Sequence, residues 1–148
     1  MRIFESMKEF KAYADKIAKK YNFKISKYNE DFSIDVDGEV VLYNSGLKKL
    51  PIKFNIVLGS FNCFGNELKS LEGCPKYVGG NFNCYYNQLT SLEYAPEYVR
   101  GWFDCLDNKL ISLKGAPEII RGKWHIEDKY KSFHEYQKYL LVKKIEAL

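Results

Sequence analysis

Long apolar runs are missing from this sequence of 148 residues. No stretch approaches the roughly 18 consecutive apolar residues that a membrane-spanning helix needs. The N-terminal segment from Met1 to Tyr21 interleaves charged with apolar side chains, whereas a signal peptide requires an uninterrupted apolar segment. We therefore expect a protein that makes no use of a membrane and that resides in the cytoplasm.

Metal-binding and catalytic motifs are missing as well. The chain has 4 cysteines and 2 histidines, and it contains no C-x-x-C pair of the kind that holds zinc. It also lacks a glycine-rich phosphate loop, a pair of catalytic carboxylates and a nucleophile elbow. We therefore expect a protein that is not an enzyme and that binds neither a metal nor a cofactor. The cysteines are expected to be small buried residues, kept reduced.

A concentrated block of positive charge is the third absence. The formal net charge is only +4, and lysine and arginine are spread evenly along the chain. Proteins that bind nucleic acid usually carry a dense basic stripe or patch. Nucleic acid is therefore the less favoured partner.

The most informative feature that is present is an internal repeat with a 21-residue period. Aligning the sequence with itself at this offset superimposes apolar residues on apolar residues, asparagine on asparagine and glycine on glycine. The matching columns are Phe61, Phe82 and Phe103; Cys63, Cys84 and Cys105; Leu68, Leu89 and Leu110; Leu71, Leu92 and Leu113; Asn66, Asn87 and Asn108; Pro75, Pro96 and Pro117; Val57, Val78 and Val99; and Gly59, Gly80, Gly101 and Gly122. Such a period indicates a solenoid in which each repeat is one coil and successive coils stack.

The repeat unit, F-x-C-x-x-N-x-L-x-S-L-x-G-x-P-x-x-V-x-G, occupies residues 61–80, 82–101 and 103–122, with Tyr94 in place of the glycine seen at Gly73 and Gly115. It resembles the leucine-rich repeat, whose core L-x-L-x-x-N-x-L corresponds here to residues 82–89. The motif L-x-S-L-x-G-x-P is similar to that of a short repeat variant found in bacteria and their phages. The resemblance implies an α/β repeat solenoid, with a parallel β-sheet built from one strand per repeat and a short convex side without helices.

Each column then has a predicted place. Alternate residues of a strand face opposite ways, so the phenylalanine and cysteine columns should point into the core. The asparagines Asn66, Asn87 and Asn108 lie where the chain leaves the strand, and their buried amides should bond loop backbone groups as a ladder. The glycine before each strand suits a turn that a side chain would obstruct.

Both ends of the stack need covers, and three segments follow from this. Residues 1–38 are predicted to form an N-terminal cap, made of an amphipathic helix ending near Tyr21 and a β-hairpin turning at Asp37-Gly38. Residues 39–126 hold five repeats. Residues 127–148 are predicted to form a C-terminal capping helix from about 132 to 147, started by a capping box of Ser132 and Glu135.

Among the outward strand positions, Tyr43, Phe64, Tyr85 and Leu106 form an apolar row on the concave face. Exposed apolar side chains rimmed by polar ones are typical of protein interfaces. Two alternatives remain: the row could be an aromatic ladder that stabilises the sheet, or an end helix could fold over it. The predicted binding residues are Tyr43, Asn62, Phe64, Asn83, Tyr85, Tyr86, Trp102, Asp104, Leu106 and His125.

The expected function is that of a non-catalytic module that binds another protein through this face. The resemblance to phage repeats implies a bacterial host protein, with a defence or regulatory role, as the partner, and the host cytoplasm as the location. One alternative is single-stranded nucleic acid whose bases stack on the same aromatics. The other is a structural or self-assembling virion protein, in which copies of the chain form a homo-oligomer.

Overall fold

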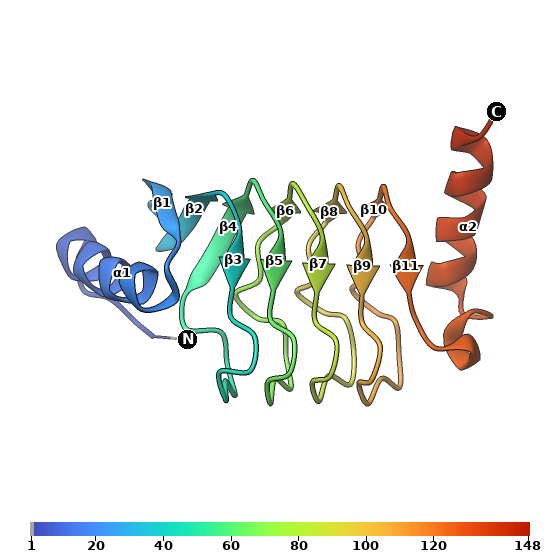
Figure 1. Cartoon of the computed structure of the whole chain (residues 1–148), viewed down its shortest axis with the longest axis horizontal. Coiled ribbons are helices and arrows are strands. Elements are labelled where there is room, and N and C mark those ends of the chain that lie inside the picture. The colour runs from blue at the N-terminus through green and yellow to red at the C-terminus, as the bar shows by residue number, and fades with distance from the viewer. Residues whose placement is uncertain (1) are drawn as a thin grey trace.

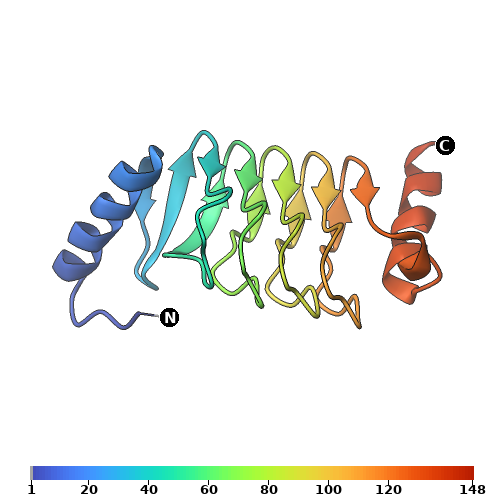
Figure 2. The ribbon, with the colours of Figure 1, turned by 60° about the horizontal axis from the view of Figure 1, so that its bottom comes forward.

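The computed structural model describes residues 2–148 and is a parallel-strand β-solenoid of about four turns with a helix at each end (Figure 1). The stack runs nearly straight between the two helices in both views, so the face predicted to be concave is close to flat (Figures 1 and 2). The elements are α1 (Met7–Tyr21), β1 (Lys24–Tyr28), β2 (Ser33–Asp37), β3 (Val40–Val41), β4 (Lys53–Val57), β5 (Phe61–Asn62), β6 (Tyr77–Val78), β7 (Phe82–Asn83), β8 (Tyr98–Val99), β9 (Phe103–Asp104), β10 (Ile119–Ile120), β11 (Trp124–His125), the 3₁₀ turn η1 (Asp128–Tyr130) and α2 (His134–Glu146).

Each coil contributes two short strands, one to each of two sheets. The front sheet has the order β3-β5-β7-β9-β11, and the back sheet has the order β1-β2-β4-β6-β8-β10. All neighbours are parallel except β1 and β2. The prediction of one strand per repeat is therefore wrong. The short convex side is free of helix, as expected, but its extended backbone pairs at the same 21-residue offset and forms the back sheet, as Val57 opposite Val78 and Val78 opposite Val99 show.

The interior is filled by the repeated columns. Phe61 pairs with Phe82 and Phe82 with Phe103, and their rings stack with centroids 5.6 and 5.3 Å apart. These three rings and the three cysteines of the Cys63 column are fully buried, as are Val57, Val78 and Val99 on the back sheet. The prediction that the phenylalanine and cysteine columns point inward is confirmed.

The coils approach each other closely at the turn between the two sheets. A Cβ atom on Gly122 would lie 2.5 Å from the carbonyl carbon of Gly101, one coil away, which no side chain can tolerate. The glycine column is therefore required by the spacing of the coils, as the sequence predicted.

The asparagine ladder is present and links successive coils. The Asn87 side chain donates to the carbonyl oxygens of Cys63 at 2.9 Å and Cys84 at 3.2 Å, and it accepts from the Leu68 backbone N–H at 3.0 Å. Asn66 and Asn108 repeat these contacts one coil to either side. Asn66 and Asn87 are buried, so their amides satisfy backbone groups that water cannot reach.

The N-terminal cap differs from the prediction in one element. Helix α1 ends at Tyr21 as expected, and Ser6 caps its first turn. The hairpin, however, consists of β1 and β2. The predicted hairpin at Asp37-Gly38 is wrong, because Gly38 makes the same passage between sheets as Gly59 one coil later, and β2 pairs in parallel with β4. The solenoid path thus begins before residue 39.

The C-terminal helix is confirmed, but its predicted capping box of Ser132 and Glu135 is wrong. Helix α2 spans His134–Glu146, and Phe133, not Ser132, is its N-cap, without a side-chain hydrogen bond. The Phe133 ring packs edge-on against Tyr130, which lies in the 3₁₀ turn before the helix. Within α2, the Tyr139 hydroxyl accepts from the Trp124 backbone N–H at 3.1 Å and donates to the Gly122 carbonyl at 3.0 Å. The helix therefore closes the free edge of β11 through a side chain.

Candidate functional site

The predicted binding residues lie together along the outer side of the front sheet and the turns that follow its strands, a surface that we call the front face. Tyr43 and Tyr86 are 52% and 62% exposed, while Phe64, Tyr85 and Leu106 are half-buried. The rings of Phe64 and Tyr85 stack with centroids 5.2 Å apart and an angle of 2° between their planes. The helices lie at the two ends of the stack, so neither folds over the sheet between them (Figures 1 and 2).

The polar residues beside this row form hydrogen bonds with the backbone of the row. The Oδ1 atoms of Asn62, Asn83 and Asp104 accept hydrogen bonds of 3.0, 2.9 and 3.0 Å from backbone N–H groups two residues further on. The residues that donate these hydrogen bonds are Phe64, Tyr85 and Leu106. These three polar side chains were predicted to bind a partner directly, and the structure gives each of them a positioning contact.

A left-handed turn follows the strand in four successive coils. Its central residues are Asn44, Gly65, Tyr86 and Asp107, with φ between 49° and 69°. Asparagine, glycine and aspartate adopt this conformation readily, whereas tyrosine does so at a cost in energy. The exposed Tyr86 ring is thus held on the front face by a strained backbone.

Carboxylates collect at the C-terminal end of the front face. Burial raises the pKa of Asp104, and the charges of Glu127 and Asp107 raise it further. Asp107 raises the pKa of Tyr85, mainly because its carboxylate accepts a hydrogen bond from the Tyr85 hydroxyl. The Trp102 ring meets His125 edge-on at 5.6 Å beside them. This end of the face is therefore both aromatic and acidic.

The four cysteines offer no reactive thiol. All are free and buried, and burial raises the pKa of Cys63 and Cys105 to about 12 and those of Cys74 and Cys84 well above the ordinary value. Because the thiolate is the nucleophile, these groups are unreactive near neutral pH. Within residues 2–148 no cluster of three histidine, cysteine or acidic side chains is placed to hold a metal ion.

Sequence reasoning missed an aromatic pair on the back sheet. Tyr77 and Tyr98 stack with centroids 5.0 Å apart and an angle of 3° between their planes, and both are half-buried. The 21-residue offset contained this signal, but the back strands were not predicted as a sheet. Stacking between coils is therefore a general property of this solenoid. The front face differs from the back sheet by carrying the more exposed tyrosines.

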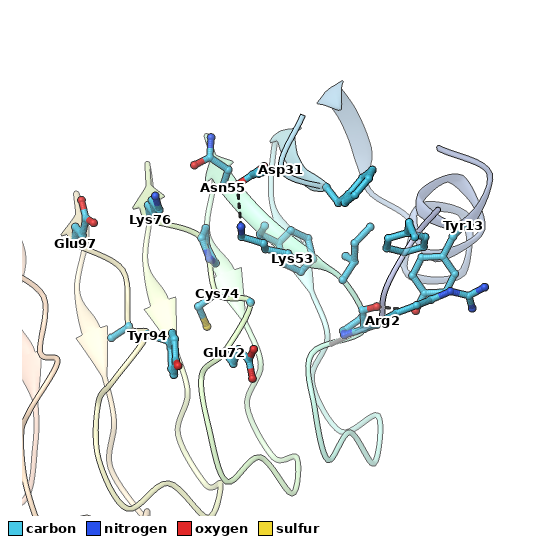
Figure 3. A pocket seen from close by; sticks show the side chains of 18 residues that line it. Arg2, Tyr13, Asp31, Lys53, Asn55, Glu72, Cys74, Lys76, Tyr94 and Glu97 are labelled. Carbon is cyan, nitrogen blue, oxygen red and sulfur yellow. Dashed lines mark hydrogen bonds and ion pairs between the residues drawn. The ribbon is translucent and has the colours of Figure 1, made fainter. Parts of the chain in front are cut away.

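A separate cleft, also missed, lies below the back sheet at the N-terminal end of the solenoid (Figure 3). Its volume is about 530 Å³. It crosses three coils, and its floor is formed by Phe54, Cys74 and Pro75. The N-terminal segment brings Arg2 to one end, and Tyr94 stands at the other.

Comparison of the chain with protein-family models, curated proteins and solved structures finds no match in any of the three. Among the described residues, neither helix has the length and apolar character needed to cross a membrane.

Proposed function

We propose that this chain is a non-catalytic repeat module of the leucine-rich type and that its front face binds another protein. The observation that carries the proposal is the open row of Tyr43, Phe64, Tyr85 and Tyr86, in which two rings are more than half exposed. Exposed tyrosines that are held by the fold bind with a small loss of side-chain entropy, and tyrosine is enriched at interaction hot spots.

The charges around the row define the partner further. The outward strand positions at the 21-residue interval form three rows, which are residues 39, 60, 81, 102 and 123; residues 41, 62, 83, 104 and 125; and residues 43, 64, 85, 106 and 127. Together these rows carry Glu39, Asp104 and Glu127 against the single cation Lys123. A partner that offers an apolar patch edged by lysine or arginine complements this surface. The resemblance of the repeats to those of bacteria and their phages favours a bacterial protein, and a host defence or regulatory protein is the proposed class.

The acidic character of the face argues against single-stranded nucleic acid. Strand binding needs stacking platforms within a positively charged groove, since neutralised phosphates supply most of the affinity. Here Asp104, Asp107 and Glu127 adjoin the aromatic row and would repel a phosphate backbone.

The experiment uses two double variants that remove equivalent stacked pairs from opposite faces. Phe64→Ala with Tyr85→Ala removes the front pair, and Tyr77→Ala with Tyr98→Ala removes the back pair. The wild-type chain is first used to capture its partner from bacterial lysate, and affinities are then measured with the purified partner. Both variants should lose similar stability, because each loses one stack of rings.

Only the front variant should lose binding, by at least a hundred-fold in Kd, as expected for truncation of two central aromatic residues. Equal losses in both variants would show that binding does not reside in the front face. Tight, salt-dependent binding of a single-stranded oligonucleotide by the wild-type chain would favour the nucleic-acid function instead.

A further inference from the structure

Tyr94 occupies a glycine position, and this anomaly bears on the cleft below the back sheet. Gly73 and Gly115 have φ of 92° and 86° at the equivalent places in neighbouring coils, and Tyr94 has φ of 68° there. A tyrosine in this conformation is strained where a glycine would not be. Its ring is also 60% exposed, so burial does not offset the strain.

The ring instead forms a wall of the cleft (Figure 3). The opposite wall includes Pro51 and Tyr13, whose hydroxyl donates to the Pro51 carbonyl oxygen at 2.6 Å. Between the walls lies the buried Gly73. The floor beneath it is apolar, since Cys74 is 7% and Phe54 1% exposed.

The spacing of stacked rings in this solenoid gives the distance at which a ligand ring would lie from Tyr94. Where aromatic side chains occupy equivalent positions in adjacent coils, their centroids lie 5.0 to 5.6 Å apart in parallel planes. A planar ligand ring stacked on the exposed face of Tyr94 would stand at this same distance from the Tyr94 ring. Aromatic rings in an offset stack attract one another at separations of this size, so the Tyr94 ring offers a stacking surface for one ligand ring.

The charges lining the cleft balance. Arg2, Lys53 and Lys76 oppose Asp31, Glu72 and Glu97, and Lys53 pairs with Asp31 at 2.8 Å. A lining without net charge favours an uncharged ligand over an anion or a cation. The volume of about 530 Å³ falls in the range of sites for small molecules.

We propose that this cleft binds a small, uncharged, planar aromatic molecule, which stacks on the exposed Tyr94 ring above the apolar floor of Cys74 and Phe54. The site lies apart from the front face and is independent of the protein-binding function proposed above. It explains why a strained, exposed tyrosine stands in a glycine column.

The test uses indole as the probe and the pair Tyr94→Gly and Tyr86→Gly as variants. The two tyrosines are matched: both have positive φ, at 68° and 57°, and both are about equally exposed, at 60% and 62%. Each substitution installs glycine where the backbone favours it, so both variants should fold and melt no lower than the wild type.

Titration of indole into the wild-type chain should shift the amide NMR signals of Gly73, Cys74 and Ala95 in a saturable manner. Tyr94→Gly should weaken this binding about ten-fold, the effect of losing one aromatic stack. Tyr86→Gly should leave it unchanged. Indole-3-acetate and tryptamine, which carry a negative and a positive charge, should both bind more weakly than indole.

Four results would overturn the proposal. They are the absence of indole binding at millimolar concentration, shifts that map away from the cleft, undiminished binding by Tyr94→Gly, and tighter binding of either charged analogue. The last would refute the assignment of an uncharged ligand.

Discussion

Replacing Asn87 by alanine tests the asparagine ladder, which connects the repeated sequence to the stability of the stack. The Asn87 side chain makes three hydrogen bonds, to the carbonyl oxygens of Cys63 and Cys84 and from the N–H of Leu68. Removing the Asn87 side chain does not leave all three of these backbone groups without a hydrogen bond. The Cys63 oxygen keeps the hydrogen bond from Asn66 at 3.0 Å, and the Cys84 oxygen keeps the one from Asn108 at 3.0 Å.

The group left without a partner is therefore the Leu68 N–H, which is buried. A buried donor without an acceptor costs about 1 to 3 kcal/mol. We predict that Asn87→Ala lowers the free energy of unfolding by about 2 kcal/mol. For a chain of 148 residues this corresponds to a fall in melting temperature of about 4 to 8 °C.

The assay is urea unfolding followed by circular dichroism, with the dependence on denaturant compared between variants. Asn83→Ala is the matched control, because this half-buried side chain accepts one backbone hydrogen bond at a place that water can reach. Asn83→Ala should lower the free energy of unfolding by less than half as much as Asn87→Ala does. An unchanged midpoint for Asn87→Ala, or an equal loss in the control, would refute the ladder as a source of stability.

A double variant sharpens the test. Asn66→Ala with Asn87→Ala removes both side-chain donors from the Cys63 carbonyl oxygen, which either single variant leaves with one. The combined loss should exceed the sum of the single losses by about 1 kcal/mol. Additive losses would show that the shared carbonyl does not couple the two asparagines.

Two further predictions concern ionisable groups. Burial raises the pKa of Asp104, so its ionised form destabilises the fold at neutral pH, and this cost disappears as the pH falls through the raised pKa. Asp104→Asn keeps an acceptor for the Leu106 N–H. It should raise the melting temperature at pH 7, and the difference from the wild type should shrink as the pH falls. A difference in melting temperature that does not change with pH would contradict this. None of the four cysteines should react with a thiol reagent at pH 8 until denaturant is added, since all are buried and Cys63 has a pKa of about 12; rapid labelling of the native chain would show otherwise.

The site was predictable only in part. The outward direction of Phe64 and Tyr85 follows from strand alternation, and both lie on the front face. That Asn62 and Asn83 hold the backbone rather than point freely to solvent was not predictable, because the turn after each strand decides it. The cleft was missed because the segment around Arg2, which lines one end of it, is distant in sequence from the coils and stands at no repeated interval from them.

The 21-residue period by itself determined the solenoid, the buried columns and the asparagine ladder. It could do so because each of these arises between equivalent residues of adjacent coils, whose separation in the chain is constant. Tertiary structure alone decided the rest. The two-residue strands of the back sheet are too short to have a pattern of their own, and they exist because stacking brings Tyr77 beside Tyr98. The chain turns at Gly38 from one sheet to the other, because this segment stacks against the turn at Gly59 in the next coil, whose N–H donates to the Gly38 carbonyl oxygen.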